Sequence, residues 1–477
     1  MYSKRLKGAS FFGIFPAGEQ TGDEPVDFPN QCDVKAFRFT GFFFDGQTRT
    51  AHLHYAFDDA VHFEETIEFC GAGKLDPDRE AALKACLRLL HLAAGVSYYK
   101  AYVPAEMKVE TGALTPDEAA FFDLFYKSGL GEFSYRNNIV PPVRFPFSET
   151  EQSRKPFSVR LSPRTAVPVG GGKDSVVTLE TLKRSGRTPV LFSVGTPRPI
   201  RETIEVSGLP SIKVLRKISP VLTELNANAQ RCGALNGHVP VTGIIAFILA
   251  AAAVLYDFSD VAMSNERSAN VGNTMMNGVM VNHQWSKSIE FEKAFTGLMQ
   301  GVLPDFRYFS LLRPLSELSI ARLFCNMEKY DSVFTSCNRA FRLDETKRLD
   351  RWCGDCDKCR FVFLALAPFA GKRRVTSMFG SDPLDDAGQI EGFRQLLGLS
   401  AFKPFECVGE IEESVWSFLR ICRAPEWKND AVVAALRENV EEKWKSRECE
   451  LAATIFSLSD EHLIPKEYAD VVGYFKG

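Results

Sequence analysis

The sequence predicts an α/β fold with a doubly wound, mostly parallel sheet, preceded by an α+β unit and followed by a helical region. Between residues 164 and 375, short apolar runs typical of buried strands alternate with segments of helical periodicity. Three adjacent glycines stand between one such run and an amphipathic helix. Beyond residue 375 the apolar residues recur at helical spacing almost throughout.

Length and composition set the outer limits of the prediction. A chain of 477 residues allows two or three domains, which we expect at 1–150, 164–375 and 376–477. Its 57 basic and 60 acidic residues leave a net charge of −3, so no polyanion-binding surface is implied overall. A hydrophobic fraction of 45% with 39 Phe indicates a well-buried globular protein.

Targeting signals are not evident in the sequence. The first residues lack the apolar stretch of a signal peptide, and the longest apolar run, 244–256, is too short to span a bilayer. The twelve Cys of so long a chain do not form a disulfide scaffold. We therefore expect a soluble cytoplasmic protein without a membrane partner.

The first unit reads as three strands over 37–44, 51–57 and 63–69. On the second strand His52 and His54 share a face, where they could ligate a metal or simply line a solvated surface; no third ligand is evident, which favours the surface. Nothing in this unit carries catalytic chemistry by itself. We expect it to act as a scaffold or as one wall of a substrate cleft.

Two helices follow in this unit with clear start signals. Asp76-Pro77 opens one that ends near Gly95, and Thr115 with Glu118 forms the capping box of a second that ends at Gly129. A polar segment rich in Ser, Arg and Pro, 149–163, then reads as a linker.

The stretch 166–186 reads as strand, glycine loop and helix. Gly170, Gly171 and Gly172 let backbone N–H groups converge on a ligand, and the following helix directs its positive dipole at the same place, a geometry that suits phosphate. Lys173 would add a point charge and Ser175 a hydroxyl. Asp174 fits beside phosphates if it caps the helix or holds Mg²⁺.

Spacing separates this loop from two familiar phosphate loops. A Walker A loop has Ser or Thr directly after Gly-Lys, and the dinucleotide fingerprint has its glycines spread out. Gly-Gly-Gly-Lys-Asp-Ser instead resembles the Ser-Gly-Gly-x-Asp-Ser PP-loop of the ATP pyrophosphatases, which cleave ATP between the α and β phosphates; Gly170 replaces their first Ser. The resemblance implies that Phe192 to Val194, on the next strand, flank the adenine. A glycine turn without a ligand is the simpler alternative.

Further strands at 189–194, 212–215 and 260–263 and a helix at 241–256 complete the α/β alternation. Ligands of such sheets lie over the carboxyl ends of the strands. Glu266 and Arg267, directly after the strand at 260–263, are therefore candidate active-site residues. Other polar residues follow, and each could equally belong to a solvated loop or helix face: His283, Lys287, Glu290 and Glu292.

The segment 313–319 resembles the Pro-Leu turn and helix of many PP-loop enzymes. Four cysteines follow it with the spacing of a metal site: Cys337, Cys353, Cys356 and Cys359. They could close a tetrahedral thiolate site for structural Zn²⁺, with Gly354 relieving the turn. The order resembles the zinc site of 7-cyano-7-deazaguanine synthases. An iron–sulfur cluster, as in some tRNA-thiolating PP-loop enzymes, is the rival.

The helical region is expected at 390–397, 411–422, 431–444 and 449–456. The loop 403–410 between the first two helices contains Cys407, which could act as an acid or base if Lys403 stabilised its thiolate. A buried structural Cys is the alternative.

Taken together, the glycine loop, Ser-Asn-Glu-Arg-Ser-Ala-Asn, Cys-Gly-Asp-Cys-Asp-Lys-Cys and Lys-Pro-Phe-Glu-Cys-Val-Gly-Glu resemble the MurL family of UDP-N-acetylmuramoyl-L-alanyl-L-glutamate epimerases over nearly the full chain. The resemblance implies an enzyme that uses ATP and Mg²⁺ to invert the terminal L-Glu of UDP-MurNAc-L-Ala-L-Glu, releasing AMP and pyrophosphate. Glu266 and Cys407 become candidates for proton transfer, and Arg267 or Lys287 for binding UDP phosphates or the glutamyl carboxylate.

Three other functions stay open from the sequence. A tRNA thiolase and a 7-cyano-7-deazaguanine synthase-like ligase would share the adenylation step, and a nucleotide sensor would bind ATP without turnover. The first unit lacks an obvious basic, aromatic RNA-binding surface, so no nucleic acid is expected.

Overall fold

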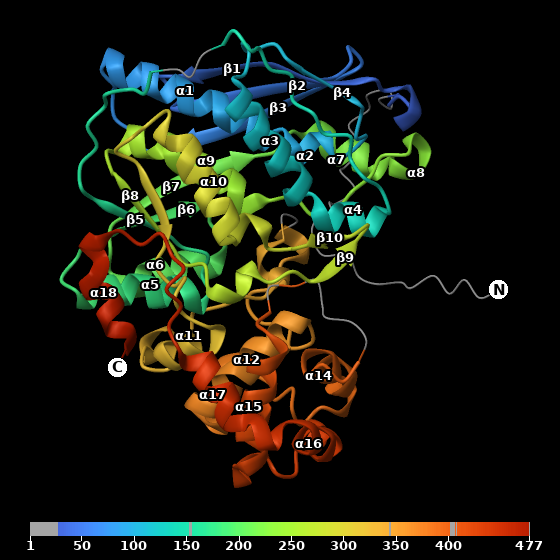
Figure 1. Ribbon diagram of the computed structural model, residues 1–477, viewed down its shortest axis with the longest axis vertical. Coiled ribbons are helices and arrows are strands. Elements are labelled where there is room, and N and C mark those ends of the chain that lie inside the picture. Colours follow the sequence, from blue (N-terminus) through green and yellow to red (C-terminus); the bar gives the residue numbers. More distant parts are fainter. Residues whose placement is uncertain (1–26, 152–154, 343–344, 401–405, 407, 477) are drawn as a thin grey trace.

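The computed structural model describes residues 27–151, 155–342, 345–400, 406 and 408–476. Their centre is a nine-stranded sheet with the order β11-β8-β5-β6-β7-β3-β2-β1-β4, and helices cover both of its faces (Figure 1). Most neighbouring strands are parallel, which confirms the α/β class and the mostly parallel sheet. No helix in the described ranges is both long and apolar enough to cross a membrane.

The parallel half of the sheet places β5 at its centre. The chain runs from β5 outward to β6 and β7, then returns to the other side of β5 for β8 and β11. Ligands of open α/β sheets bind where the strand order reverses in this way, so the loops after β5 and β8 face the expected crevice. The strands are β5 (Thr165–Pro168), β6 (Val190–Val194), β7 (Ser211–Lys217), β8 (Asp260–Met263) and β11 (Arg307–Ser310).

The antiparallel half comprises β1 (Ala36–Asp45), β2 (Thr50–Phe57) and β3 (Val61–Phe69), with β4 (Glu106–Val109) parallel to β1 at the edge. β3 pairs with β7, from Thr66 opposite Lys217 to Phe69 opposite Val214. The strands of the first unit and of the α/β region therefore belong to one sheet, although the sequence suggested a separate unit. The boundary near residue 150 stays a prediction.

The first unit otherwise follows its sequence pattern. The helices begin at the predicted caps, as α1 (Pro77–Ala94) and α3 (Pro116–Gly129), and the capping box of Thr115 and Glu118 is formed. His52 lies 2.6 Å from the carboxylate of Glu64 on the neighbouring strand, and neither His52 nor His54 joins a three-ligand group within the described chain. This placement agrees with a surface role for the pair.

Two hydrophobic cores lie on opposite faces of the sheet. Successive residues of β5 and β8 alternate between them: Ala166 and Val261 join one core, Val167 and Ala262 the other. The first core contains α1, α3, α9 (Val241–Tyr256) and α10 (Ile289–Gln300), which cover one face in Figure 1. The second contains α5 (Lys173–Arg184) and α11 (Glu317–Phe324).

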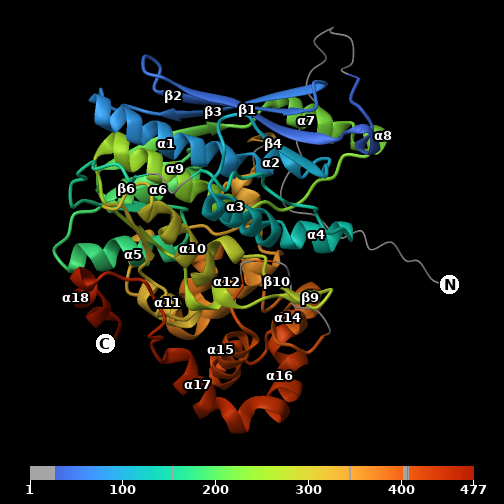
Figure 2. The ribbon, with the colours of Figure 1, turned by 45° about the horizontal axis from the view of Figure 1, so that its top comes forward.

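The C-terminal helices continue the second core and lie at the end of the molecule opposite β1–β3 (Figure 2). They are α12 (Asp357–Ala370), α13 (Lys372–Phe379), α14 (Ile390–Leu396), α15 (Ile411–Arg423), α16 (Ala431–Trp444) and α17 (Glu448–Phe456). The predicted helical region is confirmed. Its last helix, α18 (Ala469–Gly473), returns to the sheet, where the neighbouring Tyr468 hydroxyl donates to Asp260 at 2.7 Å.

Candidate active site

The glycine loop joins β5 to α5 at the carboxyl edge of the sheet, and two of its three glycines are required by their surroundings. Gly171 has φ +77°, and a Cβ there would lie 2.9 Å from Pro199 Cβ and 3.0 Å from the Pro199 carbonyl carbon. A Cβ at Gly172 would lie 2.5 Å from Ser336 Oγ. Gly170 faces open space. The Gly171 carbonyl accepts a 2.8 Å hydrogen bond from the Thr335 N–H, which holds the loop in place.

The loop leaves backbone donors for a ligand. Within the described residues, none of the main-chain N–H groups of 171–175 donates to a protein acceptor, and α5 begins at Lys173 without a side-chain cap. Asp174 therefore does not cap the helix. Donors at the positive end of a helix fit an anion such as phosphate. The loop thus has the properties that the ATP prediction requires, while ATP binding itself stays a prediction.

Lys173 lies beneath the loop and is 2% exposed. Its ammonium lies 2.5 Å from Asp174 Oδ1 and also donates to Glu317 Oε2. Burial acts to lower the pKa of Lys173, but the charges of Asp174 and Glu317 outweigh it and raise that pKa above its ordinary value. The lysine is therefore a fixed cation beside the glycine loop.

Glu317 is the first residue of α11, whose N-cap is Ser316. Burial, together with the nearby carboxylates of Asp174, Glu266 and Glu413, raises the pKa of Glu317 to about 8 despite the attraction of Lys173. Several carboxylates thus lie around Lys173, an arrangement that favours an added cation such as Mg²⁺. The sequence contained the helix-start signal of Glu317 but no sign of its partner 144 residues away.

Glu266 follows β8 directly and is 4% exposed. Within the described chain no side chain hydrogen-bonds or ion-pairs with its carboxylate, and burial raises its pKa, against the attraction of Lys287 and Lys173. Its own main-chain N–H hydrogen-bonds the carboxylate, but a buried carboxylate without a cationic partner is costly unless a ligand or a proton also satisfies it. Its position beside the glycine loop therefore makes Glu266 a candidate functional group.

Arg313 holds this edge together and is fully buried. Its guanidinium donates to the carbonyls of Glu266 (2.8 Å) and Lys287 (2.6 Å) and to the carboxylate of Glu292 (3.0 Å). It therefore ties the loop after β8 to the segment before α10. Sequence reasoning noted the Pro-Leu turn after Arg313 but missed this role, which depends on partners 21 to 47 residues away.

Arg267 points elsewhere. Its guanidinium donates to three carbonyls at the C-terminal end of α17, those of Thr454, Ile455 and Ser457, at 3.1 to 3.3 Å. The structure therefore brings Glu266 to the glycine loop while the Arg267 side chain caps a helix of the C-terminal region. The role of Arg267 in binding a ligand stays a prediction.

The other predicted nucleotide and acid–base residues are placed as follows. Phe192 is buried, and its carbonyl accepts a 2.8 Å hydrogen bond from the Val169 N–H; Val194 ends β6 beside the loop. Cys407 lies outside the described residues. The described end of its loop leads into α15, where Glu413 accepts a 3.1 Å hydrogen bond from the Leu318 N–H. The C-terminal region therefore meets α11 next to Glu317.

The four cysteines come together as the spacing predicted. The sulfurs of Cys337, Cys353, Cys356 and Cys359 all lie within 4.8 Å of one another, and Gly354 has φ +79°. Hydrogen bonds from the other three thiols lower the pKa of Cys337 well below its ordinary value. Four sulfurs in this arrangement fit a tetrahedral metal site such as structural zinc. Cys337 follows Ser336 and Thr335, so this site adjoins the glycine loop.

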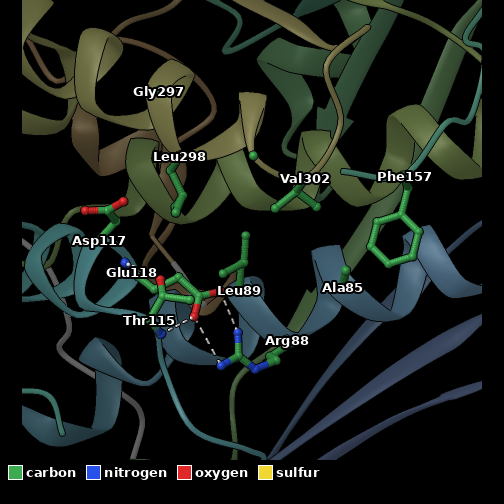
Figure 3. Close-up of a pocket in the computed structure, with 11 residues that line it drawn as sticks. Ala85, Arg88, Leu89, Thr115, Asp117, Glu118, Phe157, Gly297, Leu298 and Val302 are labelled. Atoms are coloured by element: carbon green, nitrogen blue, oxygen red, sulfur yellow. Dashed lines mark hydrogen bonds and ion pairs between the residues drawn. The ribbon is translucent and has the colours of Figure 1, made fainter. Parts of the chain in front are cut away.

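A pocket between α1, α3 and α10 lies away from this chemistry (Figure 3). The charged residues that meet there, Arg88 and Glu118, form an ion pair with each other at 2.8 Å. No residue of the glycine loop lines the pocket. The active site is therefore better sought at the carboxyl edge of the sheet.

Comparison with known proteins agrees with the motifs. The MurL N-terminal domain model matches residues 29–311, and the MurL C-terminal domain model matches residues 333–451. The chain belongs to the MurL family. The resemblance inferred from the sequence is thus confirmed. The N-terminal model spans both halves of the sheet, in keeping with the pairing of β3 and β7.

Three relatives match this chain over nearly their full lengths. The chain is 41% identical to a protein of Xanthomonas oryzae pv. oryzae, with 91% of this chain and 95% of the relative covered. It is 42% identical to a protein of Salinispora tropica (92% and 96%) and 44% identical to one of Micromonospora sp. (91% and 97%). All three are named UDP-N-acetyl-alpha-D-muramoyl-L-alanyl-L-glutamate epimerase.

Proposed function

We propose that this chain epimerises the terminal L-Glu of UDP-MurNAc-L-Ala-L-Glu to D-Glu in cytoplasmic peptidoglycan precursor synthesis, using ATP and an acyl-adenylate. The observation that supports it most is the placement of an anion-fitting glycine loop beside the buried Glu266, whose carboxylate has no side-chain partner among the described residues, in a chain of the MurL family. The loop suits the phosphates of ATP, and the carboxylate suits proton transfer.

The chemistry explains why an epimerase would need ATP. Inversion of one stereocentre changes the free energy little, so ATP is not needed for the equilibrium. The Cα–H beside an ionised carboxylate is barely acidic, however. Adenylation removes that charge and lets the carbonyl accept the electron pair left when the proton departs. Hydrolysis of the adenylate then returns the carboxylate and AMP.

Each part of the loop has a role in this proposal. The N–H groups of 170–175 and the Ser175 hydroxyl bind the β and γ phosphates, and Lys173 offsets the charge of the departing pyrophosphate. Asp174 and Glu317 would hold Mg²⁺, which neutralises phosphate charge when bound. Phe192 and Val194 flank the base, and Lys287 binds an anionic group of the muramoyl dipeptide. Arg267 is the less favoured candidate, since its guanidinium caps α17.

Glu266 is proposed as one proton-transfer group. Burial, and to a smaller extent the neighbouring Asp174, raises the pKa of Glu266 above its ordinary value against the attraction of Lys287 and Lys173, and a raised pKa favours a carboxyl group that both accepts and releases a proton. Cys407 is the other candidate that the sequence offers. The Cys cluster is proposed to hold structural zinc, for which metal analysis is the direct test; iron in a brown preparation would instead support the iron–sulfur alternative.

The test is incubation of the protein with ATP, Mg²⁺ and UDP-MurNAc-L-Ala-L-Glu in D₂O. We expect AMP, pyrophosphate, D-Glu and deuterium at the glutamyl Cα. Formation of ADP, or of AMP without deuterium at Cα, would contradict the scheme. Adenylation of tRNA or of a deazaguanine precursor in place of the dipeptide would assign the loop to the alternative enzymes, and ATP binding without turnover would indicate a sensor.

A further inference from the structure

A second cluster of titratable side chains lies outside the glycine loop. It comprises Glu132 on α4 (Gly131–Asn137), His238 before α9, and His283, which follows the hairpin of β9 (Thr274–Met276) and β10 (Val279–Val281). The His283 ring donates through Nδ1 to Glu132 Oε2, and His238 Nδ1 lies 3.7 Å from the same oxygen. The other oxygen, Oε1, accepts from Arg136. Glu132 and His283 are buried.

Hydrogen bonds connect this cluster to the loop that carries Glu266. Asn282, next to His283, donates to the Ala269 carbonyl at 2.9 Å, and the Ile289 N–H donates to the Asn270 side chain at 2.8 Å. Lys287 acts electrostatically on both Glu266 and His238. The Glu132–His283 pair and Glu266 therefore border the same region at the carboxyl edge of the sheet.

Two imidazoles and a carboxylate are also a known ligand set for divalent metals. The surroundings disfavour a cation, however. Arg136 binds Glu132, while Lys287 and the buried Lys100 act on His238. Within the described residues Lys100 has no carboxylate partner; its ammonium donates to the Gly237 carbonyl at 3.0 Å and to Asn236. Cationic groups so close to the two imidazoles oppose the binding of a metal ion and favour an anionic ligand.

We propose that His283, oriented by Glu132, is the second proton-transfer group of the epimerisation and acts on the face of Cα opposite Glu266. This inference rests on the proposed function. Glu132 holds Nδ1 and thereby the orientation of the ring, and in this proposal Nε2, on the other side of the ring, is the nitrogen that exchanges the proton. Although burial acts to raise it, hydrogen bonding to His283 and the nearby charges hold the pKa of Glu132 at about 2, so the carboxylate stays ionised.

The step balances without a further reactant. In the adenylate, the Cα–H bond breaks, the proton passes to one of the two groups, and the electron pair is delocalised into the acyl carbonyl. The other group then loses a proton to the opposite face, where the new Cα–H bond forms. No electrons are gained or lost overall, and each group regains its starting state by exchange with water.

The experiment uses the full-length protein with ATP in D₂O and each epimer in turn, UDP-MurNAc-L-Ala-L-Glu or its D-Glu counterpart. For H283Q we expect AMP from both epimers, deuterium incorporation into one epimer only, and inversion slowed by at least about 100-fold. For E266Q we expect incorporation into the other epimer only. Glu132 is a positioning residue, so E132Q should show the epimer selectivity of H283Q with a smaller loss of rate.

A matched control is available on the sheet surface, where His52 and Glu64 form the same kind of pair at 2.6 Å. H52Q should invert at the wild-type rate. The proposal is overturned if H283Q, or H283N where the Gln variant does not fold, inverts within about threefold of wild type, or makes AMP but exchanges neither epimer. A transition metal bound by the wild type and lost in H238Q/H283Q also overturns it. Failure of the wild type to make AMP rejects the proposed function instead.

Discussion

Substitution of Gly171 by Ala is expected to lower the affinity for ATP more than a glycine-to-alanine substitution at either of the other two glycines of the loop. A non-glycine residue at φ +77° costs about 1 kcal/mol. The new Cβ would also approach Pro199 to 2.9 Å and its main chain to 3.0 Å, where α6 (Arg198–Ser207) begins, and overpacking of this kind costs about 1–3 kcal/mol. Because backbone cannot rotate away as a side chain can, the loop itself must move.

The strain therefore totals about 2–4 kcal/mol. If binding has to restore the loop geometry, ATP affinity falls by about 30-fold to nearly a thousandfold. The assay is isothermal titration with a non-hydrolysable ATP analogue and Mg²⁺. Gly170→Ala is the matched comparison, because its Cβ meets no atom within 4 Å and its φ is not positive. Equal affinities for G171A and wild type, or equal losses for G170A and G171A, would refute the reasoning.

Three further predictions concern the surroundings of the loop. Removal of metal by chelation or by Cys356→Ser should lower the melting temperature and weaken ATP binding, because the segment from Cys337 back to Thr335 holds Gly171. Arg313→Met should destabilise the fold by about 3–5 kcal/mol in chemical denaturation, because it leaves the buried Glu292 carboxylate without its cation. Glu317 has a pKa of about 8 in the folded chain and a reference value of 4.5, so the folded chain binds more protons at this residue than the unfolded chain does. The free energy of unfolding should therefore fall by a few kcal/mol as the pH rises from about 4.5 to 8. Glu317→Gln should flatten that part of the profile of melting temperature against pH.

Each of these has an outcome that would contradict it. Unchanged ATP affinity in metal-depleted protein would separate the cysteine site from the loop. Arg322→Met, which removes a cation that packs on the Phe456 ring, is the control for Arg313 and should cost far less; equal losses would contradict the buried ion pair. A profile for E317Q that falls as steeply as that of wild type would assign the pH dependence to other groups.

Local features of the fold were predictable because they depend on neighbours in sequence. Periodicity and caps marked α1, α3, α9 and α16 to within a residue or two, and the short run Val261 to Met263 after Asp260 marked β8. The pairing of β3 with β7 was not predictable, because it joins segments about 150 residues apart and leaves no mark in either strand. The two units thus looked separate although they share one sheet.

The candidate site was likewise predictable only where its residues lie close together in the sequence. The glycine loop and the cysteine cluster carry their chemistry in short spacings, so their residues could be named from the sequence. Arg267 and Glu266 looked alike as polar residues after a strand, yet one side chain caps α17 and the other stays at the loop. Arg313, Glu317 and Glu132 owe their positions to distant partners, which no local pattern reports.

The strand pairing between β3 and β7 also restricts how the enzyme can move. Because Thr66 to Phe69 pair with Val214 to Lys217, the part of the sheet that carries the glycine loop and the part built from the first 150 residues cannot separate as two hinged lobes without breaking these main-chain hydrogen bonds. In the proposed reaction, entry of the sugar-nucleotide and release of pyrophosphate would then depend on smaller segments that move relative to a rigid sheet. An inhibitor that fits the surface of this sheet would then meet nearly the same surface at every stage of turnover.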